Sequence, residues 1–153
     1  MEFAGQNGVG RRPGSDRLRL VTPQPPLILL VDDFDDALDI YATYMRHFGY
    51  RVAVARNGEE AIEQARLERP DLILLDLRMP VLDGTGTLRV LRQDPQFGAV
   101  PIVALTAQAL DTERAAALAA GFDFVVSKPC LPDELLAIVA RLILPNVVKG
   151  PAA

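Results

Sequence analysis

The sequence predicts an α/β protein in which five β-strand–α-helix units build a doubly wound parallel sheet. Short apolar runs alternate along the chain with segments of helical periodicity, which is the pattern of repeated βα units. Some of these runs are apolar throughout, as expected of parallel strands that are buried on both faces. The chain has 153 residues, of which 50% are hydrophobic, and this suits one globular domain rather than two.

Five short apolar runs are predicted to be the strands, because each precedes a segment of helical periodicity. They are the segments 27–31 (LILLV), 51–55 (RVAVA), 71–76 (DLILLD), 101–106 (PIVALT) and 124–127 (FVVS).

A helix is expected after each strand. The first is indicated by apolar side chains at helical spacing, namely Ala37, Tyr41, Tyr44 and Phe48. The second is predicted over 58–68, because Asn57 and a glutamate three residues later form a capping-box pattern. The remaining helices are predicted over 87–93, 111–120 and 132–143.

The predicted domain spans residues 27–143. Residues 1–26 are rich in Gly and Pro and are expected to be a flexible N-terminal extension. Residues 144–153 are expected to be a short C-terminal tail.

Composition excludes several classes of protein. The net charge of −4 argues against a general binder of nucleic acid or anionic membranes. The apolar runs are far shorter than a membrane span. The single cysteine, Cys130, rules out an internal disulfide framework and fits a reducing compartment. We therefore predict a cytoplasmic protein with no nucleic-acid or membrane partner.

Polar residues collect where the predicted strands end. In an open parallel sheet, ligands bind beyond the carboxyl ends of the strands. The residues at this edge are two carboxylates after the first strand, one after the third, a hydroxyl after the fourth and a lysine after the fifth: Asp32, Asp33, Asp76, Thr106 and Lys128. The lysine is notable because the chain has 16 basic residues and 14 of them are Arg. One shared site explains this convergence better than five unrelated causes.

The carboxylates at this edge indicate a bound cation. Two neighbouring carboxylates about 4 Å apart repel by about 4 kcal/mol at an effective dielectric of 20, so a counter-charge is needed. Oxygen ligands without His or Cys favour Mg²⁺. A carboxylate such as Asp76, beside a cation and a lysine, is a plausible phosphoryl acceptor.

A second interpretation of the first two carboxylates stays open at this point. Asp32 and Asp33 could begin the following helix, where acidic side chains favour the exposed amides and the positive end of the dipole. Asp35, Asp36 and Asp39 fit that interpretation better and are expected to form a solvated first turn.

Four motifs together resemble the response-regulator receiver domain of two-component signalling. They are ILLVDD, DLILLDLRMPVLDG, VPIVALTA and SKP, in this order, and the resemblance covers roughly residues 27 to 143. It implies a flavodoxin-like fold with strand order 2-1-3-4-5.

The resemblance also implies a role for each site residue. Asp76 would be the phosphoacceptor, and Thr106 and Lys128 would contact the phosphoryl group. Mg²⁺ would be bound by carboxylates and one backbone carbonyl: directly by Asp33, mainly through water by Asp32, and also by Asp76 and the carbonyl of Arg78. The peptide bond from Lys128 to Pro129 would be cis.

The function that this resemblance implies is that of a single-domain response regulator. It would accept a phosphoryl group from a sensor histidine kinase or a histidine phosphotransfer protein, hydrolyse it slowly, and signal through an unknown downstream protein. It would be a phosphoacceptor rather than an enzyme. The alternatives are a phosphorelay intermediate that passes the phosphoryl group onward, a flavodoxin-like cofactor binder, and an aspartyl-phosphate phosphohydrolase.

The chain departs from the family pattern near the fifth strand. Three residues before the lysine the family usually has Tyr or Phe, which moves inward on phosphorylation, but here the residue is Val125. The aromatic Phe124 comes one position earlier and is expected on the other face of the sheet. Cys130 stands where an apolar residue is common. Arg78 and Gln108 are expected to present side chains over the phosphoryl group. We therefore predict signalling without an aromatic switch.

Overall fold

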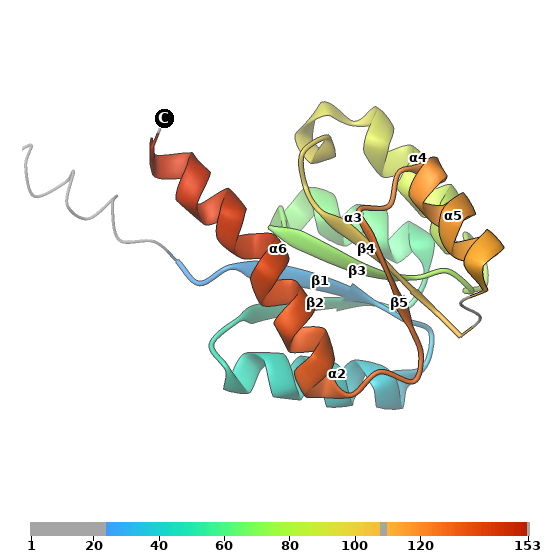
Figure 1. The fold of residues 1–153 in the computed structure, drawn as a ribbon, viewed down its shortest axis with the longest axis horizontal. Helices are drawn as coiled ribbons and strands as arrows, with labels where there is room; N and C mark the ends of the chain where they lie inside the picture. Colours follow the sequence, from blue (N-terminus) through green and yellow to red (C-terminus); the bar gives the residue numbers. More distant parts are fainter. Residues whose placement is uncertain (1–23, 108–109, 153) are drawn as a thin grey trace, which may run out of the picture.

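The computed structural model describes residues 24–107 and 110–152, and within them it shows a five-stranded parallel sheet between two layers of helices (Figure 1). The strand order is β2-β1-β3-β4-β5, which confirms the predicted topology. Most of the predicted N-terminal extension, residues 1–23, lies outside the described residues, as does Gln108.

The strands lie where the sequence predicts them, within one residue at each end. Their bounds are β1 Leu27–Val31, β2 Arg51–Ala55, β3 Leu72–Asp76, β4 Ile102–Thr106 and β5 Phe124–Ser127.

Helices α2 and α6 cover one face of the sheet, and α3, α4 and α5 cover the other (Figure 1). Their bounds are α2 Asp35–His47, α3 Gly58–Glu68, α4 Gly84–Gln93, α5 Asp111–Ala120 and α6 Pro132–Ala152, with a short 3₁₀ helix, η2, over Pro95–Phe97.

The central strands carry apolar side chains on both faces because both faces are covered. Along β1, Ile28 and Leu30 pack with α2 and α6, whereas Leu29 and Val31 pack with the other three helices. All four are fully buried. This alternation explains why the runs in the sequence are continuously apolar rather than alternating.

Helix α2 buries a different face from the one that the sequence indicated. Its buried residues are Leu38, Tyr41, Ala42 and Met45. Phe48 is 53% exposed, and its ring centroid lies 4.9 Å from that of Tyr44. The predicted stripe is right at Tyr41 and in part at Ala37, which packs half-buried against this core. It is wrong at Phe48, because the rings of Tyr44 and Phe48 pair at the edge of the helix.

The capping box at α3 forms in part. The Asn57 side chain accepts a hydrogen bond from the Glu60 amide at 2.9 Å, as predicted. The Glu60 carboxylate reaches one residue further back and accepts from the Arg56 amide at 3.1 Å. Helix α4 begins at Gly84, earlier than predicted, because the Asp83 side chain caps it by accepting from the Gly86 amide at 2.8 Å.

Helix α6 is longer than predicted. It continues beyond residue 143 to Ala152, where the sequence indicated a tail. Proline inside a helix removes one backbone hydrogen bond and crowds the carbonyl four residues earlier, which can kink a helix without ending it. Here the helix continues past Pro145. The domain boundary at residue 143 stays a prediction.

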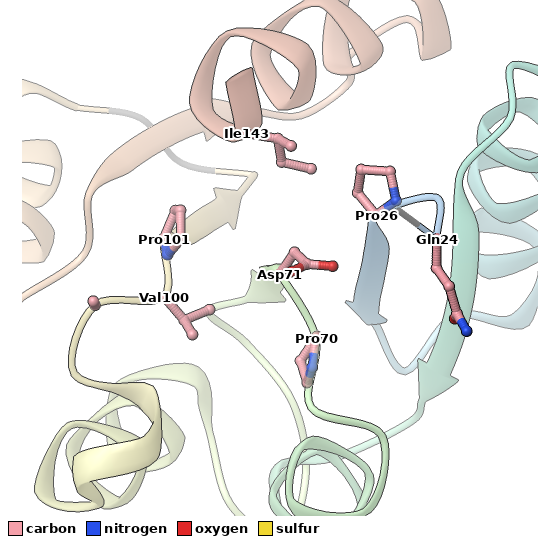
Figure 2. Close-up of a pocket in the computed structure, with 8 residues that line it drawn as sticks. Gln24, Pro26, Pro70, Asp71, Val100, Pro101 and Ile143 are labelled. Carbon is pink, nitrogen blue, oxygen red and sulfur yellow. The ribbon is translucent and has the colours of Figure 1, made fainter. Parts of the chain in front are cut away.

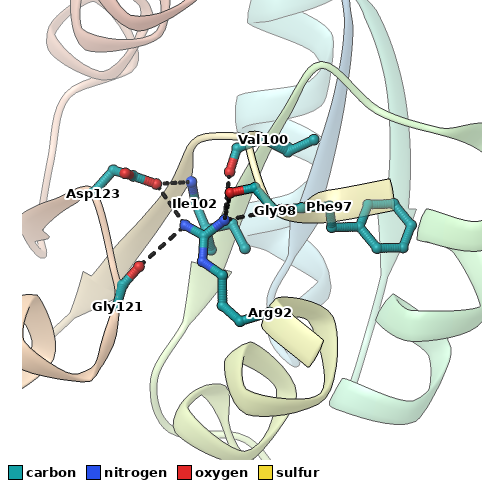
Figure 3. Close-up of polar contacts among 7 residues, drawn as sticks. All are labelled: Arg92, Phe97, Gly98, Val100, Ile102, Gly121 and Asp123. Carbon is teal, nitrogen blue, oxygen red and sulfur yellow. Dashed lines mark hydrogen bonds and ion pairs between the residues drawn. The ribbon is translucent and has the colours of Figure 1, made fainter. Parts of the chain in front are cut away.

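The side chain of Arg92, in the last turn of α4, organises the connection that follows this helix (Figure 3). Its Nη1 donates to the carbonyl oxygens of Phe97, Gly98 and Val100 at 3.0, 3.4 and 2.9 Å. These carbonyls lie in and after η2. The Phe97 carbonyl also accepts from the Val100 amide at 3.3 Å, so the guanidinium reinforces a turn that the backbone already closes.

The same guanidinium reaches the turn between α5 and β5. Its Nη2 donates to the Gly121 carbonyl at 3.1 Å and to the Asp123 carboxylate at 2.7 Å. That carboxylate oxygen also accepts from the amide of Ile102 at 2.8 Å, at the start of β4. Arg92 therefore links α4, β4 and the end of α5.

We expect Arg92→Met to lower the free energy of unfolding by about 2–3 kcal/mol, because several acceptors lose a charged donor together. Urea unfolding followed by circular dichroism measures this difference. Arg89→Met, at an exposed position on the same helix, is the matched control and should stay within about 0.5 kcal/mol of wild type. Equal midpoints for the two variants would contradict the role given to Arg92.

Candidate functional site

The structure brings the predicted polar residues together at the carboxyl edge of the sheet. Asp32 and Asp33 follow β1, Asp76 ends β3, Thr106 ends β4, and Lys128 follows β5. Asp32, Asp76 and Thr106 are buried, whereas Asp33 is exposed. One carboxylate oxygen from each of the three aspartates lies within 4.8 Å of the others, an arrangement that could hold a metal ion.

Lys128 lies within this group of carboxylates. Its ammonium donates to Asp32 Oδ2 at 2.9 Å and to Asp76 Oδ2 at 3.3 Å. Its own amide donates to the carbonyl of Thr106 at 2.7 Å, which positions the residue at the end of the sheet. The peptide bond between Lys128 and Pro129 is cis, as expected from the resemblance.

At both Asp76 and Lys128, burial and the oppositely charged neighbours shift the pKa in opposite directions. Burial raises the pKa of the Asp76 carboxyl above its usual value, and this outweighs the opposing effects of the Arg78 amide and Lys128. Burial alone would lower the pKa of the Lys128 ammonium, but its hydrogen bond to Asp32 and the charges of both aspartates outweigh burial, so this pKa is raised. The lysine is therefore a fixed positive charge beside Asp76.

The loop from β3 to α4 folds back tightly over Asp76. The Arg78 amide donates to Asp76 Oδ1 at 3.0 Å. At the far end of the loop, Gly84 packs against the backbone of β3. A Cβ there would lie 2.6 Å from the Asp76 carbonyl oxygen, so only glycine fits this approach. Between them, Val81 has a φ of 70°, in a turn closed by a 2.8 Å hydrogen bond from the Leu82 amide to the Pro80 carbonyl.

Asp32 and Asp33 do not begin helix α2. The helix starts at Asp35, and its N-cap is Phe34, which has no side-chain cap hydrogen bond. Asp32 Oδ1 accepts from the Phe34 amide at 3.0 Å, and its other oxygen faces Lys128. The helix-start interpretation therefore does not describe these two residues.

The acidic residues expected in the first turn of α2 are exposed. Asp35 and Asp36 lie in that turn, and Asp39 follows one turn later. Asp35 makes an exposed ion pair with Arg56 at 2.7 Å.

Around β5 the predicted register is correct. Val125 is buried among residues of the layer that contains α5, and Val126 belongs to the opposite core. Phe124 is 38% exposed and lies beside Ile138 and Leu142 of α6. The aromatic ring is thus on the face away from α5, as the alternation of side chains predicted.

One supporting contact was missed from the sequence. The Tyr41 hydroxyl donates to the carbonyl of Cys130 at 2.7 Å in a buried position, and so ties α2 to the segment that follows Lys128. The two residues are 89 positions apart. No local sequence pattern predicts a contact between residues so far apart. A tyrosine on a buried helix face indicates only that its hydroxyl needs some hydrogen-bond partner.

Two cavities lie at opposite ends of the sheet. One, of about 270 Å³, lies beside the site and is lined by Leu77, Arg78, Thr85, Thr106 and residues of α5. The other, of about 320 Å³, lies where the strands begin and is shown in Figure 2. Its lining includes Pro26, Asp71, Pro101 and Ile143, and none of the predicted site residues. Among the described residues, no helix is long and apolar enough to span a bilayer.

The fold and the acidic cluster define a class of protein: a flavodoxin-like α/β domain with an acidic pocket at the carboxyl edge of a five-stranded parallel sheet. Residues 28–140 match the family described as the response regulator receiver domain. The chain belongs to this family.

Curated relatives and solved structures agree with this assignment. The chain is 40% identical over 118 residues to the transcriptional regulatory protein PrrA of Mycobacterium tuberculosis, covering 77% of this chain and 50% of that protein. The chain thus spans about half the length of the curated relatives that it matches.

Two solved structures have a fold similar to that of this chain. The receiver domain of the sensor histidine kinase PA1611 from Pseudomonas aeruginosa has a TM-score of 0.72 and 39% identity, covering 78% of this chain and 98% of that chain. The chemotaxis protein CheY4 of Vibrio cholerae has a TM-score of 0.74 and 29% identity, covering 77% and 98%. The chain is therefore a receiver domain of a response regulator, a phosphoacceptor of two-component signalling, and receiver domains bind Mg²⁺ at an acidic pocket of this kind.

We expect Asp33→Ala to weaken Mg²⁺ binding at least about tenfold, because it removes the exposed carboxylate of the cluster. Without metal, the variant should be as stable as wild type or more so, because carboxylate repulsion is relieved. Isothermal titration with MgCl₂ and thermal unfolding in EDTA measure the two effects. Asp36→Ala, in the first turn of α2 and outside the cluster, is the control. Unchanged Mg²⁺ affinity in Asp33→Ala would remove Asp33 from the metal site.

Proposed function

We propose that Asp76 accepts the phosphoryl group in a reaction that depends on Mg²⁺. The observation that carries this proposal is the Lys128 ammonium, which bridges Asp32 and Asp76 within a cluster of three carboxylates. Asp76 is the member of this cluster at the end of the central strand β3, and its loop folds back around it.

The chemistry of the cluster fits a magnesium ion. Lys128 neutralises one of the three carboxylate charges, and a divalent cation would neutralise the other two. All the ligand atoms on offer are oxygens, which Mg²⁺ prefers. The ion would be held by Asp32, Asp33, Asp76 and the backbone carbonyl of Arg78. When bound, it would offset the negative charge that the phosphoryl group brings to the site.

The side chains of this chain would then divide the work of phosphoryl transfer. An Asp76 carboxylate oxygen forms a bond to phosphorus as the bond from phosphorus to the donor nitrogen breaks, and the leaving imidazole takes the electron pair and a proton from solvent water. Lys128 and the Thr106 hydroxyl each hold one phosphoryl oxygen. Positioning and charge stabilisation, rather than proton transfer by a side chain, are what this type of reaction requires.

The donor would be a phosphohistidine on a sensor histidine kinase or a histidine phosphotransfer protein, and the output would pass to a partner protein. Two comparisons support this proposal: PA1611 is a sensor histidine kinase whose receiver domain was crystallised with magnesium in its active-site cleft, and PrrA is a transcriptional regulatory protein. The chain would act as a single-domain response regulator that slowly hydrolyses its own phosphoryl group.

The test is incubation with acetyl phosphate and MgCl₂, followed by intact mass measurement. Wild type should gain one phosphoryl group, and Asp76→Asn should gain none, because its amide is a poor nucleophile for phosphorus. Asp36→Asn, an exposed aspartate of α2, should be labelled like wild type. If Asp76→Asn is labelled as well as wild type, the phosphoacceptor is another residue.

A further inference from the structure

The end of β2 contacts the site through backbone rather than through a side chain. The other four strands supply the five predicted site residues, and β2 supplies none of them. The helix that follows β2, however, touches the loop from β3 to α4: the Gly58 amide donates to the Leu82 carbonyl at 3.2 Å. Amides in the first turn of a helix have no partner within the helix, so this bond satisfies one of them from the loop.

The first turn of α3 is a firm support for this contact. The Asn57 side chain accepts from the Glu60 amide, and the Glu60 carboxylate accepts from the Arg56 amide. Ala61, in the same turn, is fully buried in the core that α3 shares with α4 (Figure 1). The capping pattern that the sequence analysis identified therefore fixes the residue that holds the loop.

Gly58 is needed at this position because of close approach. It is buried, and its φ lies outside the left-handed region, so the backbone conformation alone does not require glycine. A Cβ there would lie 2.5 Å from the Leu82 carbonyl oxygen and would also overlap the hydroxyl oxygen of Thr87 in α4. Thr87 is fully buried, and its hydroxyl donates to the Asp83 carbonyl at 2.7 Å. Any side chain at Gly58 would therefore displace the loop backbone, α4 or both.

Leu82 belongs to the short loop that encloses Asp76. At one end of this loop, the Arg78 amide donates to Asp76 Oδ1 at 3.0 Å. At the other end, the Gly84 amide donates to the Leu77 carbonyl at 3.1 Å. The loop is thus closed on itself, and the bond from Gly58 holds it from outside. Because both ends are fixed, a displacement at Leu82 must be taken up by the residues between Arg78 and Leu82.

We propose that Gly58 is a positioning residue of the phosphorylation site. Its amide and its lack of a side chain hold the β3–α4 loop where the Arg78 backbone meets Asp76 and can reach a bound Mg²⁺. The part that concerns Mg²⁺ and phosphoryl transfer rests on the proposed function, whereas the loop contact does not. In this arrangement β2 contributes geometry to a site for which the other strands contribute chemical groups.

The loop contact is tested without Mg²⁺ or a phosphoryl donor. Amide hydrogen exchange over residues 77–84 should be about fivefold faster in Gly58→Ala than in wild type, the factor expected for the loss of one ordinary hydrogen bond. Gly98→Ala is the matched control, because the nearest atom to its Cβ would be the Pro95 carbonyl oxygen at an ordinary 3.7 Å. It should match wild type. Unchanged exchange in Gly58→Ala, or an equal rise throughout the sheet, overturns the role of Gly58.

A Mg²⁺ titration separates positioning from general destabilisation. Gly58→Ala should bind Mg²⁺ about tenfold less tightly in isothermal titration with MgCl₂, as expected when the support behind a metal ligand is lost. Thr87→Ala should also be less stable than wild type, because it loses buried atoms, but it does not push the loop. Its Mg²⁺ affinity should therefore stay within about twofold of wild type. Equal affinities of Gly58→Ala and wild type overturn the proposal.

The double variant Gly58→Ala/Thr87→Ala carries the same test if Gly58→Ala does not fold. It removes the overlap with the hydroxyl and keeps the overlap with the Leu82 carbonyl. It should bind Mg²⁺ at least about threefold less tightly than Thr87→Ala. An affinity equal to that of Thr87→Ala shows that the loop does not respond to Gly58, and this overturns the proposal.

Labelling by acetyl phosphate shows which proposal fails. At MgCl₂ concentrations below saturation, Gly58→Ala should be labelled more slowly than wild type by the same factor as its loss of Mg²⁺ affinity. If wild type is labelled and Gly58→Ala is labelled equally fast, the role of Gly58 is overturned while the proposed function stands. If wild type is not labelled, the proposed function falls, and exchange over residues 77–84 still decides whether Gly58 positions the loop.

Discussion

The site depends on the contact of the Lys128 ammonium with the carboxylates of Asp32 and Asp76, which would repel each other without it. Asp32 follows β1 and Asp76 ends the neighbouring strand β3. The parallel sheet therefore brings their carboxylates together in a buried position. The Lys128 ammonium between them offsets part of that repulsion. Removing one member of such a buried group leaves the others uncompensated, which is why the three side chains act as a unit. The remaining negative charge makes the edge of the sheet attractive to a divalent cation.

Several distant segments hold this unit in place. Lys128 is positioned by its own amide on β4 and by the segment after it, whose Cys130 carbonyl is tied to Tyr41 of α2. Asp76 is enclosed by a loop that returns so closely that Gly84 must lie against the β3 backbone. The same loop contains Val81 at a positive φ, a conformation that a β-branched side chain disfavours and that persists because the flanking contacts fix it. Backbone approach and hydrogen bonding, more than apolar packing, therefore set the geometry of the site.

The sequence was sufficient for the parts of the structure that depend on local pattern. Continuous apolar runs predicted the strands, and the polar residues that end them predicted which side chains would meet, because a parallel sheet brings all carboxyl ends to one edge. It was insufficient where contacts between distant residues decide. The buried face of α2 was misjudged because Tyr44 and Phe48 satisfy each other at its edge. The five hydrogen bonds of Arg92 and the two of Arg114 could not be predicted either, since an arginine on a helix gives no local sign of the carbonyls that it will reach.

These two arginines hold in place a helix that barely enters the core. A well-packed helix resists small displacements because close-packed side chains have no space to move into. Helix α5 is different: it buries one alanine, borders a cavity and is tied to its surroundings mainly through guanidinium groups. Hydrogen bonds of this kind each contribute modestly and can be exchanged for bonds to water, so they hold a helix less rigidly than close packing does. The difference between its ends then matters more than its average stability. The end near Phe122 has a buried ring and cannot shift without opening the core, whereas the end near Arg114 can move at the loss of two hydrogen bonds, one of them exposed.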